Sequence, residues 1–100
     1  MDPDLADLSI ADVVVSTAGR DAGNLFYVIE TDDVFLMLVD GKSRTMEKPK
    51  KKKRKHAKKV LRSETRVADK LRNGERVLSS EIRRDLAYIS RELQSNALGG

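Results

Sequence analysis

Hydrophobic residues gather in three short runs within the first forty positions of the chain. The runs are centred on Val13-Val14-Val15, residues 25–29 and residues 34–39. β-Branched and aromatic side chains favour strands, and the polar segments between the runs hold glycines or paired aspartates, which favour turns. The pattern therefore predicts three strands, over about residues 11–18, 24–30 and 34–39.

The second and third runs are almost continuously apolar and do not alternate cleanly. Such runs are typical of strands that are buried on both faces or closed into a small barrel. Asp40-Gly41 is a strong turn signal, and residues 42–47 are expected to begin another strand that Pro49 breaks or confines to an edge. Residues 50–55 are predicted as a last, highly charged strand that ends in a turn at His56-Ala57.

From Ser63 onward the hydrophobic period becomes that of a helix. Ser63 is expected to cap a first short helix with Val67, Ala68 and Leu71 on one face, and Asn73-Gly74 ends it. A second short helix is expected to begin at Ser79 or Ser80, with Glu81 favourable near its N-terminus.

The second helix carries one apolar stripe at spacings i, i+4, i+7 and i+11, formed by Ile82, Leu86, Ile89 and Leu93. Arg83, Arg84 and Arg91 lie largely off this stripe. The stripe has two possible uses: it packs back on the strands, or it binds a partner helix or a second copy of the chain.

These patterns predict a mainly β fold of four or five strands followed by two short α-helices. The expected organisation is a flexible acidic segment over residues 1–7, a small barrel over 8–60 ending in the basic strand, a helical segment over 61–94 and a disordered tail over 95–100.

Composition excludes several kinds of chemistry. The chain of 100 residues has no cysteine, so it holds no disulfide and no thiolate metal site. His56 is its only histidine, too few for a zinc site of the usual type. No nucleophile motif, phosphate loop or dinucleotide fingerprint is present. We therefore expect no enzyme activity, no metal and no cofactor.

The chain is also expected to be a cytoplasmic protein without a membrane partner. Its first residues, Met1-Asp2-Pro3-Asp4, are acidic and lack the layout of a secretory signal. No apolar run approaches the roughly 20 residues that a membrane-spanning helix needs.

Charge is sorted sharply along the chain. Residues 1–47 hold three basic and ten acidic side chains, whereas residues 48–62 hold ten basic and no acidic ones. The basic run is formed by Lys48, Lys50, Lys51, Lys52, Lys53, Arg54, Lys55, Lys58, Lys59 and Arg62. A run of this kind binds nucleic acid by releasing counterions from phosphates.

Other interpretations of the basic run stay open. It could be a nuclear-localisation-like address, a solubilising or membrane-surface tract, or a disordered solvated segment.

The loop between the first two strands is the sharper candidate. Gly19 and Gly23 can adopt positive φ, and Arg20 between them can reach a phosphate with its guanidinium while the loop amides approach the same group. The alternative is a tight turn in which Arg20 pairs with Asp21 or is merely exposed. Lys42 and Arg44 would extend the same basic face, or are ordinary exposed loop charges.

Aromatic residues are few, namely Phe26, Tyr27, Phe35 and Tyr88. If the second strand alternates, Phe26 or Tyr27 faces outward, and Tyr27 is the better candidate for stacking on a base. The alternative places both in the core. Their scarcity favours contact with structured RNA through backbone and shape over stacking on a single strand.

The loop also carries a family resemblance. The segment Val14-x-Ser16-x-Ala18-Gly19-Arg20-Asp21-Ala22-Gly23 resembles the KOW motif, and the likeness continues through Leu36-x-Leu38-Val39-Asp40-Gly41 into the basic run ending at Lys55-His56. It covers about residues 8–60. The chain is similar to small KOW proteins of the non-bacterial large ribosomal subunit and to short bacterial KOW-domain RNA-binding proteins.

The resemblance implies an SH3-like barrel that binds ribosomal or other structured RNA, with a ribosome- or translation-associated role. It implies a turn position for His56, with RNA contact as the second possibility. The candidate RNA-binding residues are Gly19, Arg20, Gly23, Lys42, Arg44, Lys50, Lys51, Lys52, Lys53, Arg54, Lys55 and His56. Two other functions stay open: an adaptor that binds a protein on the helical stripe, and a KOW module that touches RNA polymerase.

Overall fold

A computed structural model describes the backbone of residues 8–99 and the side chains of residues 8–95. The predicted flexible segment over residues 1–7 and the last residue of the predicted tail lie outside the described part.

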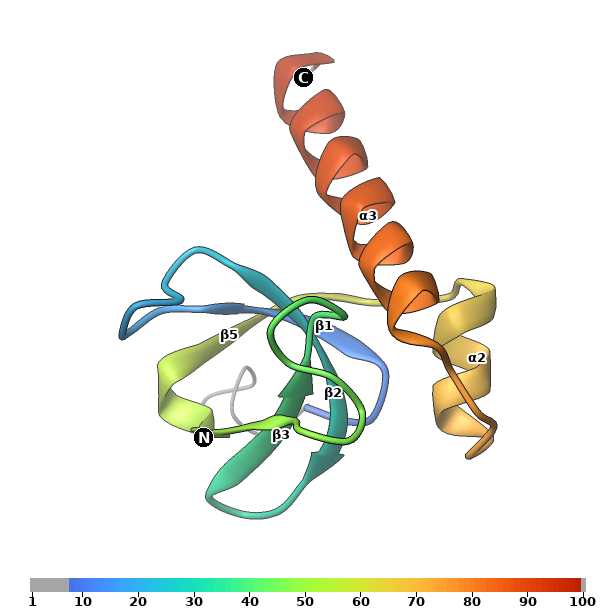
Figure 1. The fold of residues 1–100 in the computed structure, drawn as a ribbon. Coiled ribbons are helices and arrows are strands. Elements are labelled where there is room, and N and C mark those ends of the chain that lie inside the picture. Colours follow the sequence, from blue (N-terminus) through green and yellow to red (C-terminus); the bar gives the residue numbers. More distant parts are fainter. Residues whose placement is uncertain (1–7, 100) are drawn as a thin grey trace.

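Five strands form one antiparallel sheet, which confirms the mainly β fold (Figure 1). The strands are β1 (Asp12–Ser16), β2 (Leu25–Thr31), β3 (Phe35–Val39), β4 (Lys50–Lys53) and β5 (Ala57–Arg62). They lie in the order β4-β3-β2-β1-β5, and a single 3₁₀ turn, η1 (Arg54–His56), carries the chain from one edge of the sheet to the other.

Residues 50–62, which hold all of the basic run except Lys48, form β4, η1 and β5, so the interpretation of the run as a disordered segment is wrong. The sequence also missed β5, which follows η1 directly and pairs with β1. Lysine is depleted in strands, so the local sequence does not predict one here. The hydrogen bonds of the ladder with β1 nevertheless stabilise this segment as a strand.

The strand expected to begin over residues 42–47 is absent, and a turn takes its place. The Asp40 carboxylate accepts the backbone N–H groups of Lys42 and Arg44 at 2.8 and 2.9 Å. The carbonyl oxygen of Arg44 accepts the N–H groups of Asp40 and Gly41 in return. This aspartate satisfies the backbone locally, in the manner of an Asx turn, so no strand partner is needed.

Both faces of the central strands are buried, as the continuous apolar runs predict. One face lines the interior of the curved sheet, where the side chains of Leu8, Val14, Phe26, Val28, Leu36 and Leu38 pack together. The other face, with Val13, Tyr27 and Val39, packs against the helices. Phe26 and Tyr27 are both buried, which confirms the interpretation that places both in the core, and neither ring is open for stacking on a base.

Two helices follow the sheet, α2 (Arg66–Arg72) and α3 (Ser79–Gly99). Thr65, not the predicted Ser63, caps α2 by accepting the Ala68 N–H, because Ser63 is buried beside Tyr27. The second helix has 21 residues, so it is not short, and it continues through residues 95–99 where a tail was predicted.

The apolar stripe of α3 is buried against the sheet. Ile82, Leu86 and Ile89 are at most 6 % exposed, and Leu93 is partly buried against the same cluster. The sequence left two uses of the stripe open, and the structure shows the first of them, packing on the strands. Beyond Leu93, the C-terminal end of α3 projects away from the sheet (Figure 1).

A buried polar cluster joins the sheet to both helices. The Tyr27 hydroxyl donates to the Asp85 carboxylate on α3 and lies 2.8 Å from the Ser63 hydroxyl. The Thr65 hydroxyl donates to the same carboxylate at 2.8 Å. Burial and the hydrogen bond to Asp85 raise the pKa of Tyr27 to about 12, so the phenol stays protonated and keeps donating at neutral pH.

Candidate nucleic-acid interface

Strand β4 divides the basic run between two environments. Lys50 and Lys52 lie opposite the buried residues Leu38 and Leu36 of β3, and therefore share their inward face. Lys51 and Lys53 lie opposite Met37 and Phe35 on the outer face. Neighbouring lysines thus differ in exposure, and Lys52 is only 8 % exposed while Lys51 and Lys53 are exposed.

The inward lysines meet a carboxylate from the β1–β2 loop. Asp21 Oδ1 lies 3.0 Å from Lys52 Nζ and accepts the Ser16 hydroxyl at 2.7 Å, and its Oδ2 lies 2.8 Å from Lys50 Nζ. Lys52 Nζ also donates to the Ala18 carbonyl at 2.9 Å. We call Ser16, Asp21, Lys50 and Lys52 the Asp21 cluster, and it ties the loop to β4.

The cluster holds Asp21 in its charged form. Burial raises the pKa of this carboxyl, but the hydrogen bonds from Lys50, Ser16 and Lys52, together with the charge of Lys52, outweigh burial. The net pKa lies far below the usual value for aspartate. Asp21 therefore pairs with lysines of β4, and the pairing with Arg20 that the sequence left open is wrong.

Arg54 is also used within the fold. Its Nη1 donates to the Thr31 hydroxyl at 2.6 Å and to the Asp32 carbonyl at 2.9 Å. The Asp32 carboxylate in turn accepts the N–H groups of Phe35 and Val34, which lowers its pKa. Arg54 thus fastens the β2–β3 turn to the end of β4.

Five lysines of the run are exposed. Lys48 lies before β4, and we call the other four, Lys51, Lys53, Lys55 and Lys58, the outward lysines. Lys51 Nζ lies 4.3 Å above the Phe35 ring, a cation–π contact that leaves the charge unneutralised. Lys53, Lys55 and Lys58 make no ion pair with any residue of the described part. By contrast, Lys59 Nζ lies 3.4 Å from Asp12 Oδ2, and Arg62 Nε lies 3.0 Å from Glu64 Oε1, so both cations form ion pairs.

The loop has the backbone that its glycines predict, with φ of +85° at Gly19 and +91° at Gly23. The Gly23 N–H donates to the Ser16 carbonyl at 2.8 Å, so that amide is not available to a ligand. Arg20 is exposed, and its guanidinium makes no hydrogen bond or ion pair within residues 8–95. Of the loop groups proposed for phosphate, the structure leaves this side chain open to solvent.

His56 closes η1 and is partly exposed. Its carbonyl oxygen accepts the Thr17 N–H at 2.9 Å, which joins the end of the basic strand to the β1–β2 loop. Lys42 is exposed and Arg44 is half-buried, and both lie in the turn after β3. The candidate residues therefore lie in two loops, in β4 and in η1, and they do not form a single row.

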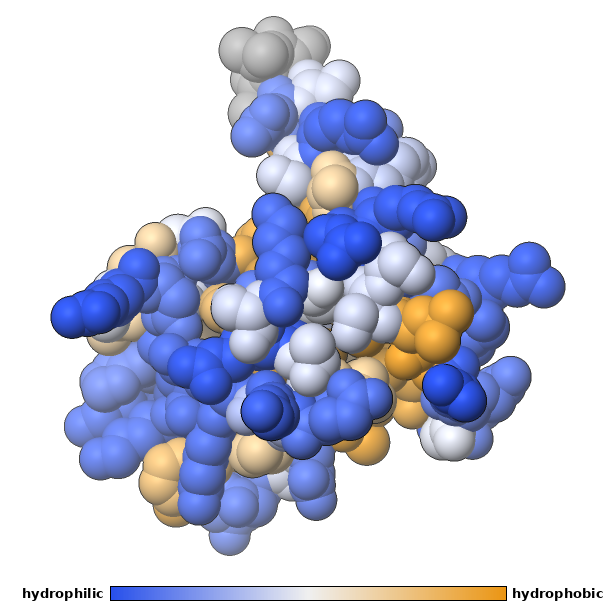
Figure 2. Space-filling model, viewed as in Figure 1, coloured by the Kyte–Doolittle hydropathy of each residue, from blue (hydrophilic) through white to orange (hydrophobic). Residues whose placement is uncertain are grey.

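Hydrophilic residues cover most of the face seen in Figure 2, including the region of the β1–β2 loop and η1, and the clearest hydrophobic patch lies where α3 begins beside α2. No group of three or more His, Asp or Glu residues within the described part is arranged to hold a metal ion. None of the helices described is both long and apolar enough to cross a membrane.

The sequence missed the part that Asp21 plays. The sequence suggested it as a partner for Arg20, whereas its carboxylate pairs with two lysines about thirty positions away. Only the alternation of β4 read together with the closure of the sheet could have revealed this pairing.

Compared with protein-family models and with curated proteins, the chain matches none. The resemblance to KOW proteins therefore stays a prediction from the residues that carry it.

Proposed function

We propose that the protein binds structured RNA, with the outward lysines and Arg20 contacting phosphates. The observation that carries the proposal is the set of exposed ammonium groups on β4, η1 and β5, which no carboxylate of the described part neutralises. Each phosphate contact by such a group releases a condensed counterion, and this release drives association at low salt.

Two further points support RNA as the ligand. The curved five-stranded sheet with a 3₁₀ turn between its edge strands is compatible with an SH3-like barrel, which the KOW resemblance implies. The polar outer face also holds Phe35 and Met37, half-buried between the lysines. Because the Lys51 ammonium group lies over the Phe35 ring, this face offers cations to phosphates in place of an open aromatic ring for a base. A ribosome- or translation-associated role follows from the resemblance.

The adaptor function loses the surface on which it was based. Ile82, Leu86 and Ile89 are occupied by the sheet, so they are not open to a partner in this structure. We therefore propose RNA binding as the one function. Co-purification with ribosomes would indicate a role in translation, and co-purification with RNA polymerase would indicate a role in transcription.

The test is RNA affinity across a salt series for three forms of the full chain. The first is wild type, and the second replaces Lys51, Lys53 and Lys55 with Gln. The control replaces three exposed residues of the helical region with Gln, Arg66 on α2, Arg76 between the helices and Arg84 on α3, which removes the same charge from another part of the molecule.

We expect the lysine variant to reduce the slope of log affinity against log salt by about 2 to 3, because each duplex phosphate contact contributes about 0.9. The control should change the slope by less than about 1. Equal losses in the two variants would mean that binding follows net charge alone, and the proposed surface would be wrong.

A further inference from the structure

A groove runs between α3 and the two loops that flank the sheet on that side. Its volume is about 720 Å³, within the range of roughly 300–1,000 Å³ seen for ligand sites. The loops and strand ends contribute Gly23, Asn24, Leu25, Asp40 and Lys42, and α3 contributes Arg83, Leu86, Ala87, Ser90, Arg91 and Gln94.

The groove is fixed by the way the turn after β3 packs under α3. A Cβ atom on Gly41 would lie 2.3 Å from the Ser79 carbonyl oxygen, so only glycine permits this approach. Gly41 also has a φ of +77°, which disfavours other residues. Arg83 Nη1 donates to the Gly41 carbonyl at 3.0 Å and holds the helix to the turn.

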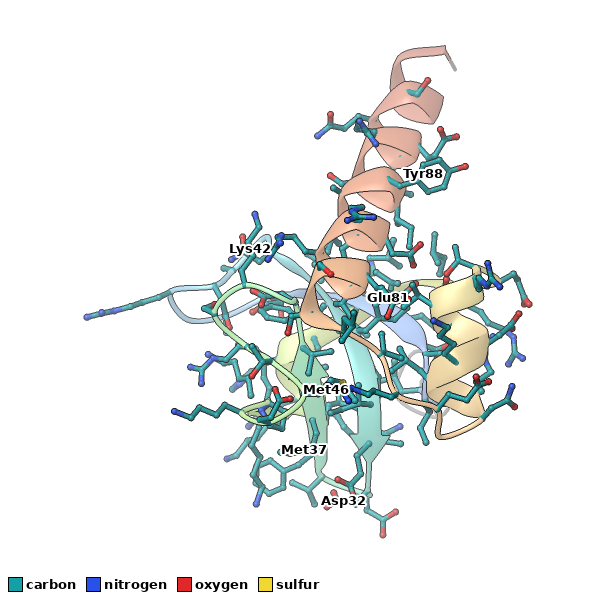
Figure 3. The ribbon with its side chains drawn as sticks, turned by 45° about the vertical axis from the view of Figure 1, so that its right-hand side comes forward. Asp32, Met37, Lys42, Met46, Glu81 and Tyr88 are labelled. Atoms are coloured by element: carbon teal, nitrogen blue, oxygen red, sulfur yellow. The ribbon has the colours of Figure 1, made fainter. Side chains whose placement is uncertain are left out.

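The charges along the groove are mostly positive. Lys42 and Arg91 are exposed and make no ion pair within the described part, and Arg83 has guanidinium N–H groups beyond the one bound to Gly41. Figure 3 shows Lys42 beside α3, while Tyr88 projects from the opposite side of the helix.

The one acidic residue of the groove lining is Asp40, and its carboxylate is turned to the protein. Its Oδ1 accepts the N–H groups of Lys42 and Arg44, and its Oδ2 lies 3.3 Å from the Ser43 hydroxyl. These bonds hold the carboxylate in the turn, and its single negative charge is outnumbered by the positive charges of Lys42, Arg83 and Arg91. An anionic ligand therefore meets cations on both sides of the groove.

We propose that this groove holds a single-stranded segment of RNA, continuing from the surface already assigned to structured RNA. The inference rests on the proposed function. Lys42 and Arg91 contact phosphates, and the accessible Leu25 and Ala87 provide an apolar floor for ribose or a base face. The side-chain amides of Asn24 and Gln94 can donate to and accept from base edges.

Continuity of the loop supports this occupant. Gly23 and Asn24 belong to the same β1–β2 loop as Arg20. Only a few residues of the loop separate its tip from the groove, so one RNA chain can contact both. The sequence already contained a signal for this face. Arg83, Ala87, Ser90, Arg91 and Gln94 recur at i, i+4, i+7, i+8 and i+11, which makes a polar stripe beside the buried apolar one.

The test uses two RNA probes, a hairpin with a single-stranded 3′ oligouridylate tail and the same hairpin without it. The groove variant replaces Lys42 and Arg91 with Gln, and the control replaces the exposed Arg76 and Arg84 with Gln. Because all four side chains are exposed, all variants should keep the unfolding midpoint of wild type.

We expect the groove variant to bind the tailed hairpin roughly 20-fold more weakly than wild type at 0.1 M salt, since two single-strand contacts contribute about 0.7 each to the salt slope. It should bind the untailed hairpin like wild type. Amide NMR signals of Gly23 and Asn24 should shift when oligouridylate is added.

The outcomes separate the two proposals. If the groove variant equals the control on both probes while the outward-lysine variant loses affinity, the groove inference is overturned and the proposed function stands. If no variant loses affinity, both fail. If an oligoglutamate of equal charge shifts Gly23 and Asn24 as strongly as oligouridylate, the groove binds acidic peptides and the inference for RNA is overturned.

Discussion

The two sides of β4 use the same residue type for opposite purposes. On the inner side, Lys50 and Lys52 neutralise Asp21 and tie a loop to the sheet. On the outer side, Lys51 and Lys53 stay in solvent with unneutralised charge. The comparison teaches that a run of lysines in a strand is divided between the two faces of the sheet. Because successive side chains point to opposite faces, the position of a lysine along the strand decides which face it occupies.

The physical reason for the division is solvation. An ammonium group removed from water loses its hydration, and it is tolerated when a carboxylate and further hydrogen bonds replace the lost water. Lys52 has both, from Asp21 and the Ala18 carbonyl. An exposed lysine keeps its hydration and contributes little to folding, so it is available for a ligand.

The largest expected effect comes from removing the shared carboxylate. Asp21→Asn leaves Lys52, which is 8 % exposed, without a charged partner. We expect a loss of about 2 to 3 kcal/mol in the free energy of unfolding, measured by urea denaturation. Asp33→Asn removes the same charge from the exposed β2–β3 turn and should cost less than about 0.5 kcal/mol. Equal costs would show that the Asp21 cluster contributes nothing specific.

The same carboxylate predicts a dependence on pH. The folded pKa of Asp21 lies below the value of about 3.9 for an unfolded chain. Its contribution to stability is therefore present above about pH 4 and is lost as the pH falls through the lower folded pKa. The difference in unfolding free energy between wild type and Asp21→Asn should shrink steadily below pH 4. A difference that stays constant down to pH 2 would contradict the assignment.

Arg54, which follows β4 and is half-buried, is expected to give a stability loss of intermediate size. Arg54→Ala removes its hydrogen bonds to the Thr31 hydroxyl and the Asp32 carbonyl. We expect a loss of about 1 to 2 kcal/mol, smaller than for Asp21→Asn because Arg54 is half-buried and these two partners are uncharged. Unfolding by urea measures the cost. Arg54→Lys serves as the control, since it keeps the charge and loses the forked geometry.

The smallest effect on folding is expected at the loop tip. Arg20→Ala should change the unfolding free energy by less than about 0.5 kcal/mol, because the exposed guanidinium makes no recorded bond within residues 8–95. It should lower the salt slope of RNA binding by about 0.9. A titration with structured RNA measures this change, and an unaltered slope would remove Arg20 from the interface.

Much of the fold could be predicted from the hydrophobic pattern. The first three strands and the apolar stripe of Ile82, Leu86 and Ile89 follow from local periodicity, whereas the burial of the stripe against the sheet was one of two roles that the sequence left open. The predictions that failed concern features that depend on residues distant in the sequence. β5 exists because β1 offers a free edge, and the cap of α2 moves to Thr65 because Tyr27 engages Ser63.

The candidate site divides in the same way. Composition alone marks the basic run, but it does not separate Lys52 from Lys53, since both are lysines between lysines. Their roles differ because Asp21 reaches one and not the other. The groove beside α3 likewise depends on how the turn at Gly41 meets the helix, which no single segment encodes.

The most direct test compares Lys52→Gln with Lys53→Gln, two adjacent substitutions of identical chemistry. Both unfolding free energy and affinity for structured RNA are measured for each. We predict that Lys52→Gln lowers stability by about 1 to 2 kcal/mol and leaves the salt slope of RNA binding unchanged, whereas Lys53→Gln leaves stability unchanged and lowers the slope by about 0.9. If the two variants lose stability and salt slope to the same extent, the division of β4 into a structural side and an RNA-binding side is wrong.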